Sequence, residues 1–417
     1  MRIASINVTA DLSTGRIAAD ICRMAQHYGH QTLLCYSRGY PPTDVPSYRV
    51  GERVHRPAKP ARPPKPRKAG KGRRLSVRLP DAPTVNRLTP IVGRLTPLID
   101  RADALSVSMG VRIHALGARL TDHAGFFSRR ATRRLIRQLE LYKPDVVHLH
   151  NLHGYYLNVE LLFRWLAKAD IPVVWTLHDC WAYTGHCAHY SMAGCDRWLK
   201  GCDHCPQLSA YPASWFIDDS ARNWVRKRAA FTSVQCMTLV TPSYWLADEV
   251  HHSFLGKRDI RVIPNGVDLQ QFRPYDEPER LRGMIQRFHL DRLGDRHIIL
   301  AVASTWIRAK GVDDLFELST LLRPDIQLVM VGLSRAQLEH LPDSVIGLPR
   351  TANLRDLVAL YTIADAVISM SYEETQGMTL IEALACGTQV IARDATALPE
   401  TVTPDVGALF TDVEGAA

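Results

Sequence analysis

The sequence predicts an α/β protein with two doubly wound, Rossmann-like domains, each built around a parallel sheet. Apolar runs of strand length alternate with helix-patterned segments along most of the chain, and this order is typical of parallel sheets. The order stops at a turn marked by Pro264 and Asn265-Gly266 and then begins again. The chain of 417 residues is long enough for two domains, and its 46% apolar and 22% charged content is ordinary for a globular protein.

The first domain should start with a strand, a helix and a second strand, with a turn at Asp11–Arg16 after the first strand. We expect these elements at Ile3–Val8, Ile17–His27 and Gln31–Tyr36. The order recurs with strands and a helix at Asp145–His150, Tyr155–Ala167, Ile171–Leu177 and Cys236–Val240.

The second domain should repeat the same alternation. Strands are expected at His297–Ala303, Ile326–Val331 and Asp365–Met370, and helices near 311–322 and at 353–363. We place the boundary so that residues 1–268 and 269–417 form the two domains, with a cysteine-rich insertion at about 180–206 in the first.

Two glutamates follow the strand at 365–370, on either side of a glycine that opens an apolar helix. Glu374 would lie in the loop beyond the strand's carboxyl end, where open α/β sheets bind ligands. The free N–H groups of Gly377, Met378 and Thr379 would form an anion site, with Glu382 one to two turns further along. Because carboxylates repel phosphate but accept hydrogen bonds from sugar hydroxyls, the pattern indicates a nucleotide-sugar site. A less specific interpretation is an ordinary amphipathic helix with two solvated carboxylates.

The spacing Glu374-x7-Glu382, followed by Ala-Leu-Ala-Cys-Gly387, resembles the signature of the retaining glycosyltransferases of family 4. The resemblance covers most of the chain outside roughly 45–120. It implies the GT-B fold, in which two doubly wound domains face each other across a cleft. It also implies an enzyme of the hexosyltransferase type, which moves a sugar from a nucleoside-diphosphate sugar to an acceptor with retention of configuration. Glu374 would contact the donor sugar and Glu382 the nucleotide ribose.

The first domain offers further candidates for the cleft. Gly15 resembles the family's amino-terminal glycine loop, which faces the donor diphosphate, although a generic strand-to-helix turn has the same pattern. His178 follows a predicted buried strand, where the family often has a histidine facing the donor sugar, although a lone histidine is more often structural. His148, His150 and His153 end the preceding strand and could line the acceptor side.

The second domain offers candidates for holding the nucleotide. Lys310 stands before a glycine as the family's diphosphate-binding lysine does, and Arg308 is the nearest substitute for a family arginine that this chain lacks. Asn353 and Leu354 resemble the loop that packs on the nucleotide base. Lys310, Arg308 and the helix start at 377–379 would stabilise the leaving diphosphate, so we expect no catalytic metal or other catalytic cofactor.

The cysteines are concentrated in one segment. Five of the nine lie at positions 180, 187, 195, 202 and 205, and in a reducing cytoplasm such a cluster favours metal over disulfides. Two thiolates spaced as in Cys202-x2-Cys205 can bind one tetrahedral zinc ion. We therefore predict a structural zinc site made by Cys187, Cys195, Cys202 and Cys205. His186, His189 or His204 could replace one ligand, and unconnected thiols in a loop are the alternative.

Other segments refine the resemblance. Residues 262–268 and 272–274 look like the family's interdomain linker, while 175–187 and 211–214 look like a subgroup associated with bacterial surface-polysaccharide assembly, including colanic-acid enzymes. Family members usually continue beyond the point at which this chain ends, so we expect the second domain to be short at its carboxyl end.

Positive charge gathers in a single stretch. Residues 51–75 carry ten Lys or Arg and one acidic residue, so the net charge of this stretch equals the net charge of +9 of the whole chain. This stretch is rich in proline and glycine and lacks periodicity, so we expect a disordered loop. Attraction of residues 56–74 to anionic lipid headgroups would suit an acceptor carried on a membrane lipid, and a solubilising loop is the alternative. Because the amino terminus lacks a signal-peptide pattern, we expect a cytoplasmic protein. If residues 56–74 bind lipid headgroups, it would lie peripherally at the inner face of the membrane.

A different class, a zinc-containing nucleic-acid-binding protein, is also permitted by the cysteine cluster and the pI near 9.1. Against it, the charge lies in one loop and no basic and aromatic residues alternate near the cysteines. A phosphorylase-like enzyme of the same two-domain shape is disfavoured, since no pyridoxal-binding lysine motif is evident. We therefore expect a nucleoside-diphosphate sugar and a glycan or lipid-linked acceptor as partners, and no nucleic acid.

Overall fold

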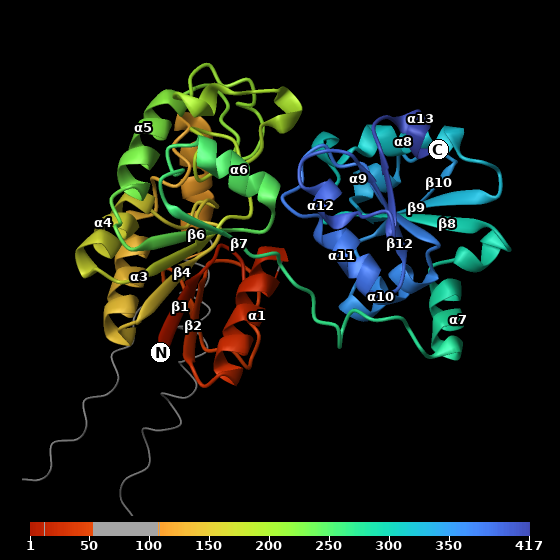
Figure 1. The fold of residues 1–417 in the computed structure, drawn as a ribbon, viewed down its shortest axis with the longest axis horizontal. Helices are drawn as coiled ribbons and strands as arrows, with labels where there is room; N and C mark the ends of the chain where they lie inside the picture. The colour runs from red at the N-terminus through yellow and green to blue at the C-terminus, as the bar shows by residue number, and fades with distance from the viewer. Residues whose placement is uncertain (12, 53–106, 108) are drawn as a thin grey trace, which may run out of the picture.

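The computed structural model describes residues 1–11, 13–52, 107 and 109–417. They form two α/β domains joined by an extended stretch (Figure 1). Apart from residues 51 and 52, the predicted basic loop 51–75, including 56–74, lies outside the described residues. In the part of the chain that is described, no helix is long and apolar enough to cross a membrane.

The first domain contains a parallel sheet of seven strands. From edge to edge, these are β3 (Ser47–Arg49), β2 (Gln31–Tyr36), β1 (Arg2–Ile6), β4 (Val146–Leu149), β5 (Val173–Thr176), β6 (Met237–Thr241) and β7 (Asp259–Val262). The chain continues from β1 towards one edge and from β4 towards the other. Their carboxyl ends therefore flank the kind of crevice in which open α/β sheets bind ligands.

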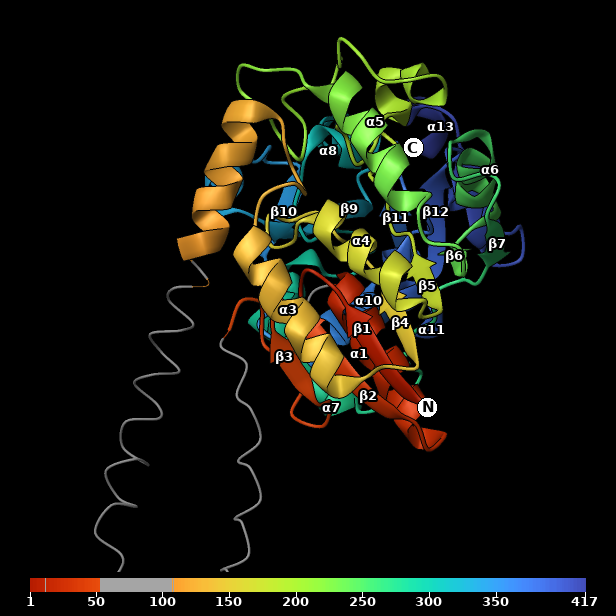
Figure 2. The same cartoon turned by 90° about the vertical axis from the view of Figure 1, so that its left-hand side faces the viewer.

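Helices cover both faces of this sheet. Figures 1 and 2 show α3 (Arg129–Tyr142), α4 (Val159–Ala169) and α5 (Ser220–Phe231) on the face away from the second domain, and α1 (Ser13–His27) on the face towards it. A helix at 109–121 precedes α3, and α6 (Tyr244–His252) connects the last two strands.

Helix α4 illustrates how the sequence sets these positions. Its buried residues Val159, Leu162, Phe163 and Leu166 recur at helical spacing. The side chain of Asn158 caps the helix by accepting a hydrogen bond from the N–H of Leu161 at 2.9 Å. One apolar face thus packs on the sheet, and the helix start is satisfied locally.

The second domain has a parallel sheet of six strands. Their order is β10 (Val345–Pro349), β9 (Ile326–Leu333), β8 (His297–Val302), β11 (Ala366–Ser369), β12 (Gln389–Arg393) and β13 (Gly407–Phe410). The helices are α7 (Pro278–Arg287), α8 (Val312–Leu321), α9 (Arg335–Leu338), α10 (Leu354–Ile363), α11 (Met378–Ala385), α12 (Leu398–Thr401) and α13 (Val413–Ala416). The direction of winding changes between β8 and β11, so a second crevice lies at their carboxyl ends.

The predicted pair of doubly wound parallel-sheet domains is confirmed, with differences at the level of single elements. Five strands, β3, β7, β10, β12 and β13, were not predicted, because they are short or half exposed and lack a long apolar run. Helix α1 begins at Ser13 instead of Ile17, so Gly15 lies in its first turn and not in a loop. Helix α4 begins at Val159 instead of Tyr155, because Tyr155 adopts a left-handed backbone conformation with φ of 68°.

An aromatic cluster between the first sheet and its outer helices forms the centre of the largest core. Phe163, Trp175 and Phe231 contact one another with ring centroids 4.6 to 5.4 Å apart. Phe163 and Phe231 are fully buried. Because these rings belong to α4, β5 and α5, their packing fixes the carboxyl end of β5, where His178 follows.

Phe163→Ala should therefore lower the free energy of unfolding of the first domain by about 3–5 kcal/mol, through lost burial and the cavity that remains. Thermal unfolding followed by tryptophan fluorescence measures the effect. Phe216→Ala, at a position that is 77% exposed, is the control and should change little. Equal transitions in the two variants would contradict the assigned core.

Candidate functional site

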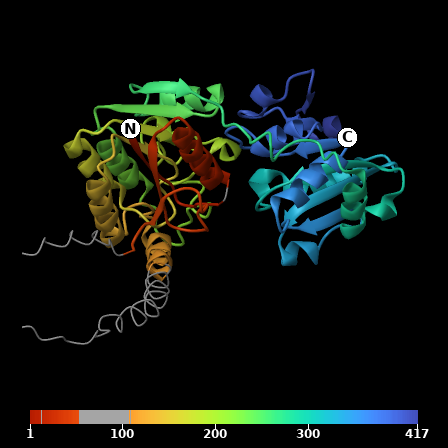
Figure 3. The ribbon, with the colours of Figure 1, turned by 90° about the horizontal axis from the view of Figure 1, so that it is seen from below.

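Loops from both crevices meet between the domains. The hydroxyl of Thr375, in the loop after β11, donates to the carbonyl of His178, just after β5, at 3.2 Å. In the same loop, the Gln376 side chain accepts from the backbone N–H of Asn265 at 2.8 Å, in the linker. Figure 3 shows the two domains side by side, with this linker between them. Residues from two sheets and the linker therefore share one region.

Glu374 lies in this loop and forms an ion pair with Lys310. The loop backbone is fixed on both sides, since the N–H of Tyr372 donates to Ala309 at 3.0 Å and that of Glu374 to Thr396 Oγ1 at 3.0 Å. A side chain at Gly311 would clash, because an added Cβ would lie 2.3 Å from the carbonyl oxygen of Met370. The glycine after the lysine thus allows the two loops to approach.

Glu382 is buried in α11 and binds residues of both domains. Its carboxylate accepts from the hydroxyl of Tyr361 at 3.0 Å and from the guanidinium of Arg16, in the first domain, at 2.9 Å. Burial raises the pKa of this carboxyl, while Arg16 and Tyr361 oppose the rise. Sequence reasoning missed both partners, although Arg16 directly follows the predicted glycine position.

The start of α11 presents backbone donors to this region. Gly377 is the residue before the helix, adopts φ of 82° and has no side chain to cap the first turn. The N–H groups at Met378 and Thr379 are therefore placed as an anion site at a helix start requires. The helix start lies where the sequence analysis expects it, and anion binding at residues 377–379 stays a prediction.

The remaining nucleotide candidates lie around the second crevice, except for Gly15, which lies in α1 of the first domain. Arg308 is exposed in a short 3-10 turn, Arg308–Lys310, two residues before Lys310. Asn353 caps α10, because its side chain accepts from the N–H of Asp356 at 2.9 Å, and Leu354 is the first residue of that helix. Gly15 packs so closely that an added Cβ would lie 2.7 Å from the backbone of Ala10.

His178 belongs to a group of histidines at the carboxyl ends of β4 and β5. A hydrogen bond of 3.1 Å joins His178 Nε2 to His150 Nδ1, and His148 Nε2 lies 2.8 Å from Thr176 Oγ1. Burial lowers the pKa of His148 and of His178 to about 4 and that of His150 well below its usual value. The side chains of these three histidines are therefore neutral at neutral pH.

His153, the fourth histidine of this sequence stretch, is held separately. It lies 2.6 Å from the carboxylate of Asp179 and 3.1 Å from the hydroxyl of Tyr211. Burial raises the pKa of Asp179, but the His153 interactions outweigh it, and the pKa falls to about 2. Asp179 therefore remains ionised, next to the histidine His153 that is a candidate for the acceptor side of the cleft.

The cysteine-rich segment touches the donor loop. The backbone N–H of Met192 donates to Glu373 Oε1 at 2.7 Å, and His189 Nδ1 lies 4.0 Å from the same carboxylate. Glu373 is 4% exposed and directly precedes Glu374. Sequence analysis did not identify this contact, which joins residues 181 positions apart.

The four predicted zinc ligands line one small cavity together with His186. The thiols of Cys187 and Cys205 are hydrogen-bonded to each other, and Cys202 accepts from the N–H of Gly185 at 3.0 Å. In the described ranges, no three His, Cys, Asp or Glu side chains are grouped as a metal ion requires. Zinc binding thus remains a prediction. His189 pairs with Glu373, and His204 is exposed.

Two doubly wound parallel-sheet domains whose loops meet between them have the architecture of the GT-B fold. Residues 94–271 match the family model described as Glycosyltransferase Family 4, and residues 285–416 match that of Glycosyl transferases group 1. Together, these two matches place the chain among the family 4 glycosyltransferases.

Individual relatives are consistent with this assignment. The chain is 27% identical over 278 residues to the putative colanic acid biosynthesis glycosyl transferase WcaC of Escherichia coli, with 65% of each chain covered. It is 27% identical over 291 residues to D-inositol 3-phosphate glycosyltransferase of a Mycobacterium species, covering 66% of this chain and 60% of that protein. The chain thus spans somewhat less than two thirds of the length of these relatives.

Solved structures share the fold. Sucrose-phosphate synthase of Thermosynechococcus elongatus superposes with a TM-score of 0.61 at 15% identity, covering 100% of this chain and 87% of that one. Anabaena Alr3699/HepE in complex with UDP superposes with a TM-score of 0.57 at 14% identity, covering 100% and 88%. At these sequence identities, the likeness shows the GT-B fold alone.

The histidine group predicts how stability depends on pH. Because the folded-state pKa of His148 lies below the unfolded value near 6.5, stability is full above that value and is lost as pH falls towards 4. The loss for one such histidine is about 2 kcal/mol between pH 7 and 5. Thermal unfolding of His148→Gln, which keeps a polar group near Thr176, should therefore depend less steeply on pH. The exposed His340→Gln is the control, and an unchanged slope for His148→Gln would contradict the assignment.

Proposed function

We propose that this protein transfers a sugar from a nucleoside-diphosphate sugar to a glycan acceptor and retains the configuration at the sugar's anomeric carbon. The observation that carries the proposal is the position of Glu374, Lys310 and Glu382 at the second crevice. Glu382 pairs there with Arg16 of the first domain, and Thr375, next to Glu374, donates to the carbonyl of His178. Carboxylates for sugar hydroxyls and donors for a diphosphate thus occur side by side.

The diphosphate would lie between Lys310 and the start of α11. Lys310 is half-buried, and its ammonium is a mobile point charge that can exchange a carboxylate for a phosphate oxygen. The N–H groups at 377–379 add donors without adding a flexible side chain. Arg308, exposed nearby, would supply a weaker contact, and the backbone at Asn353 and Leu354 would pack on the base.

The donor sugar would then face Glu374 and the neutral His178. In the reaction, the bond from the anomeric carbon to the diphosphate breaks, a bond from that carbon to the acceptor oxygen forms, and the proton of the acceptor hydroxyl passes to the leaving diphosphate. The main requirement is stabilisation of the charge that develops on the leaving diphosphate, which fixed donors in a partly dehydrated site provide. Glu374 would bind hydroxyls of the donor sugar, and Glu382 would bind hydroxyls of the ribose. The residues of this chain would therefore act by positioning the donor and by stabilising charge.

We assign the acceptor to bacterial polysaccharide assembly, supported by the likeness to the putative colanic acid glycosyl transferase. A lipid-linked glycan acceptor would place the enzyme at a membrane surface. Residues 56–74, outside the described part of the chain, would then attract anionic headgroups through their Lys and Arg side chains. The zinc-containing nucleic-acid-binding alternative belongs to a class other than the family shown.

A panel of nucleotide sugars tests the proposal. We expect at least one uridine, guanosine or adenosine diphosphate sugar to raise the unfolding temperature, because a ligand that binds only the folded chain stabilises it. The corresponding free diphosphate should stabilise as well. NMR of the product formed with that donor should show the donor's anomeric configuration. No stabilisation by any donor would contradict the proposed site, and an inverted product would contradict retention.

Lys310→Ala should lower turnover at least ~100-fold, equivalent to about 2.7 kcal/mol of transition-state stabilisation. The reason is loss of the cation nearest the leaving diphosphate, so Lys310→Arg should recover part of the activity. Steady-state kinetics with the donor found in the panel measures the effect. Lys168→Ala, at an exposed position of α4, is the matched control. Turnover near that of the unmodified protein in a folded Lys310→Ala variant would overturn the role.

A further inference from the structure

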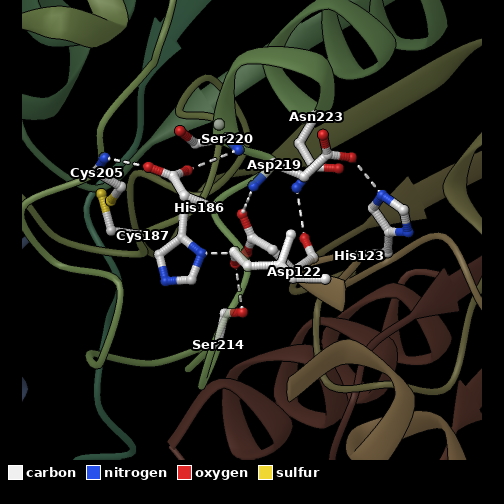
Figure 4. Close-up of polar contacts among 12 residues, drawn as sticks. Asp122, His123, His186, Cys187, Cys205, Ser214, Asp219, Ser220 and Asn223 are labelled. Atoms are coloured by element: carbon white, nitrogen blue, oxygen red, sulfur yellow. Dashed lines mark hydrogen bonds and ion pairs between the residues drawn. The ribbon is translucent and has the colours of Figure 1, made fainter. Parts of the chain in front are cut away.

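We propose that Cys187, Cys195, Cys202 and Cys205 bind one structural Zn²⁺ ion, which fixes the cysteine-rich segment against the donor loop. The first argument is that the four cysteines lie around one place. The four cysteines line one cavity, although they are spread over the loops before, between and after two short 3-10 helices. Figure 4 shows the sulfur atoms of Cys187 and Cys205 next to each other. Four thiolates around one ion form a common structural zinc site.

The second argument is the lack of regular structure around the cavity. Between β5 and α5, which are separated by residues 177–219, the described chain has only the short 3-10 helices Ser191–Ala193 and Arg197–Leu199. A stretch of this length without strands or α-helices needs another source of order within a compact domain. A metal ion that joins distant loop positions provides it, since ligand binding and folding of such segments are coupled.

The third argument concerns buried positive charge. Lys227 of α5 is 1% exposed, and its ammonium donates to the carbonyl oxygens of Trp181 and Thr184 at 2.8 and 3.0 Å. No ion pair joins Lys227 to a carboxylate in the described residues. A buried ammonium without an anionic partner is costly. Zinc bound by four thiolates carries two net negative charges, which would act on Lys227 together with the carboxylates of Asp122 and Asp179.

The fourth argument is an unpartnered polar atom. His186 lines the same cavity and is 2% exposed, and its Nε2 is buried without a hydrogen-bond partner among the described residues. Its Nδ1 binds the carboxylate of Asp122, towards which Figure 4 shows the ring turned. In histidines that bind a metal ion, the ring nitrogen that faces away from the ion is commonly held by a carboxylate, and His186 has this arrangement. Four thiolates would, however, complete a tetrahedral site without it. We assign His186 to support the thiolates as a hydrogen-bond donor.

The sulfur atoms must still move to surround one ion, because as they stand no three candidate ligands of the described chain are so grouped. Rotation between staggered side-chain conformations is the smallest such change. Space at Gly185 is already limited, since an added Cβ would lie 2.6 Å from Cys202 Cβ and 2.2 Å from the Ser220 carbonyl oxygen. The backbone there is therefore packed closely around Cys202.

Such an ion would act on the candidate donor site through position alone. The segment between Cys187 and Cys195 contains Met192, whose N–H binds the buried Glu373 beside Glu374. Holding the two cysteines fixes the ends of this short segment. This consequence, unlike zinc binding itself, rests on the proposed function.

Metal analysis of the full chain tests the proposal. After expression with zinc available, the purified protein should contain about one zinc per chain, and a mercurial reagent that blocks thiols should release it to a chelating dye. Cys202→Ser/Cys205→Ser should contain roughly tenfold less zinc, because two thiolate ligands are lost. The control Cys236→Ser removes an exposed cysteine outside the cavity and should retain the metal.

If the double variant does not fold, measurements on the unmodified protein still test the proposal. Thiol titration of the native chain should find the four cavity cysteines protected until zinc is removed. Well under one zinc per chain in folded protein, or a disulfide between Cys187 and Cys205 in freshly purified protein, would overturn the proposal. Because zinc content is measured without substrate, its failure is distinguishable from failure of the donor panel.

Discussion

The ion pair between Glu382 and Arg16 is the interaction on which the arrangement of the cleft depends. Glu382 is 3% exposed, and an ionised carboxylate at such a position is unfavourable unless it is paired and hydrogen-bonded. Tyr361, from its own domain, satisfies one oxygen, but the opposite domain supplies the compensating charge. Burial of one side chain thus ties the start of α1 to α11. The two crevices therefore face each other in the described structure.

Contacts of the same kind extend this constraint. Glu400 accepts hydrogen bonds from the N–H groups of Tyr244 and Trp245 at 2.7 and 2.6 Å, at the start of α6. A carboxylate from the second domain thus occupies the positive end of a helix in the first. Glu373 accepts from Met192 in a similar manner. In each case an acidic side chain of the second domain satisfies backbone donors in a helix of the first, so these contacts add to the ties between the two domains.

The sequence was most informative where chemistry is local. The loop with Glu374 and the start of α11 were predicted because a buried strand, a glycine and an apolar helix follow one another directly, and Lys310 was predicted from the family resemblance. The edge strands β3 and β7 were missed, since they are short and gain their order from a neighbour that a sequence pattern does not reveal. Arg16 was missed for a related reason. Its partner is 366 residues away, and only the packed domains bring them together.

Charge within the cleft suggests how a donor would enter. Three carboxylates, Glu373, Glu374 and Glu382, lie close to one another in sequence, and Lys310 and Arg16 already neutralise two of them. A diphosphate adds negative charge, so it can bind only if it shares or replaces the carboxylates as partner of these cations. In the proposed function, that exchange frees oxygens of Glu374 and Glu382 to accept hydrogen bonds from sugar hydroxyls. The groups that close the unliganded cleft are then the groups that recognise the donor, and a ligand lacking either the diphosphate or the sugar would complete only half of the exchange.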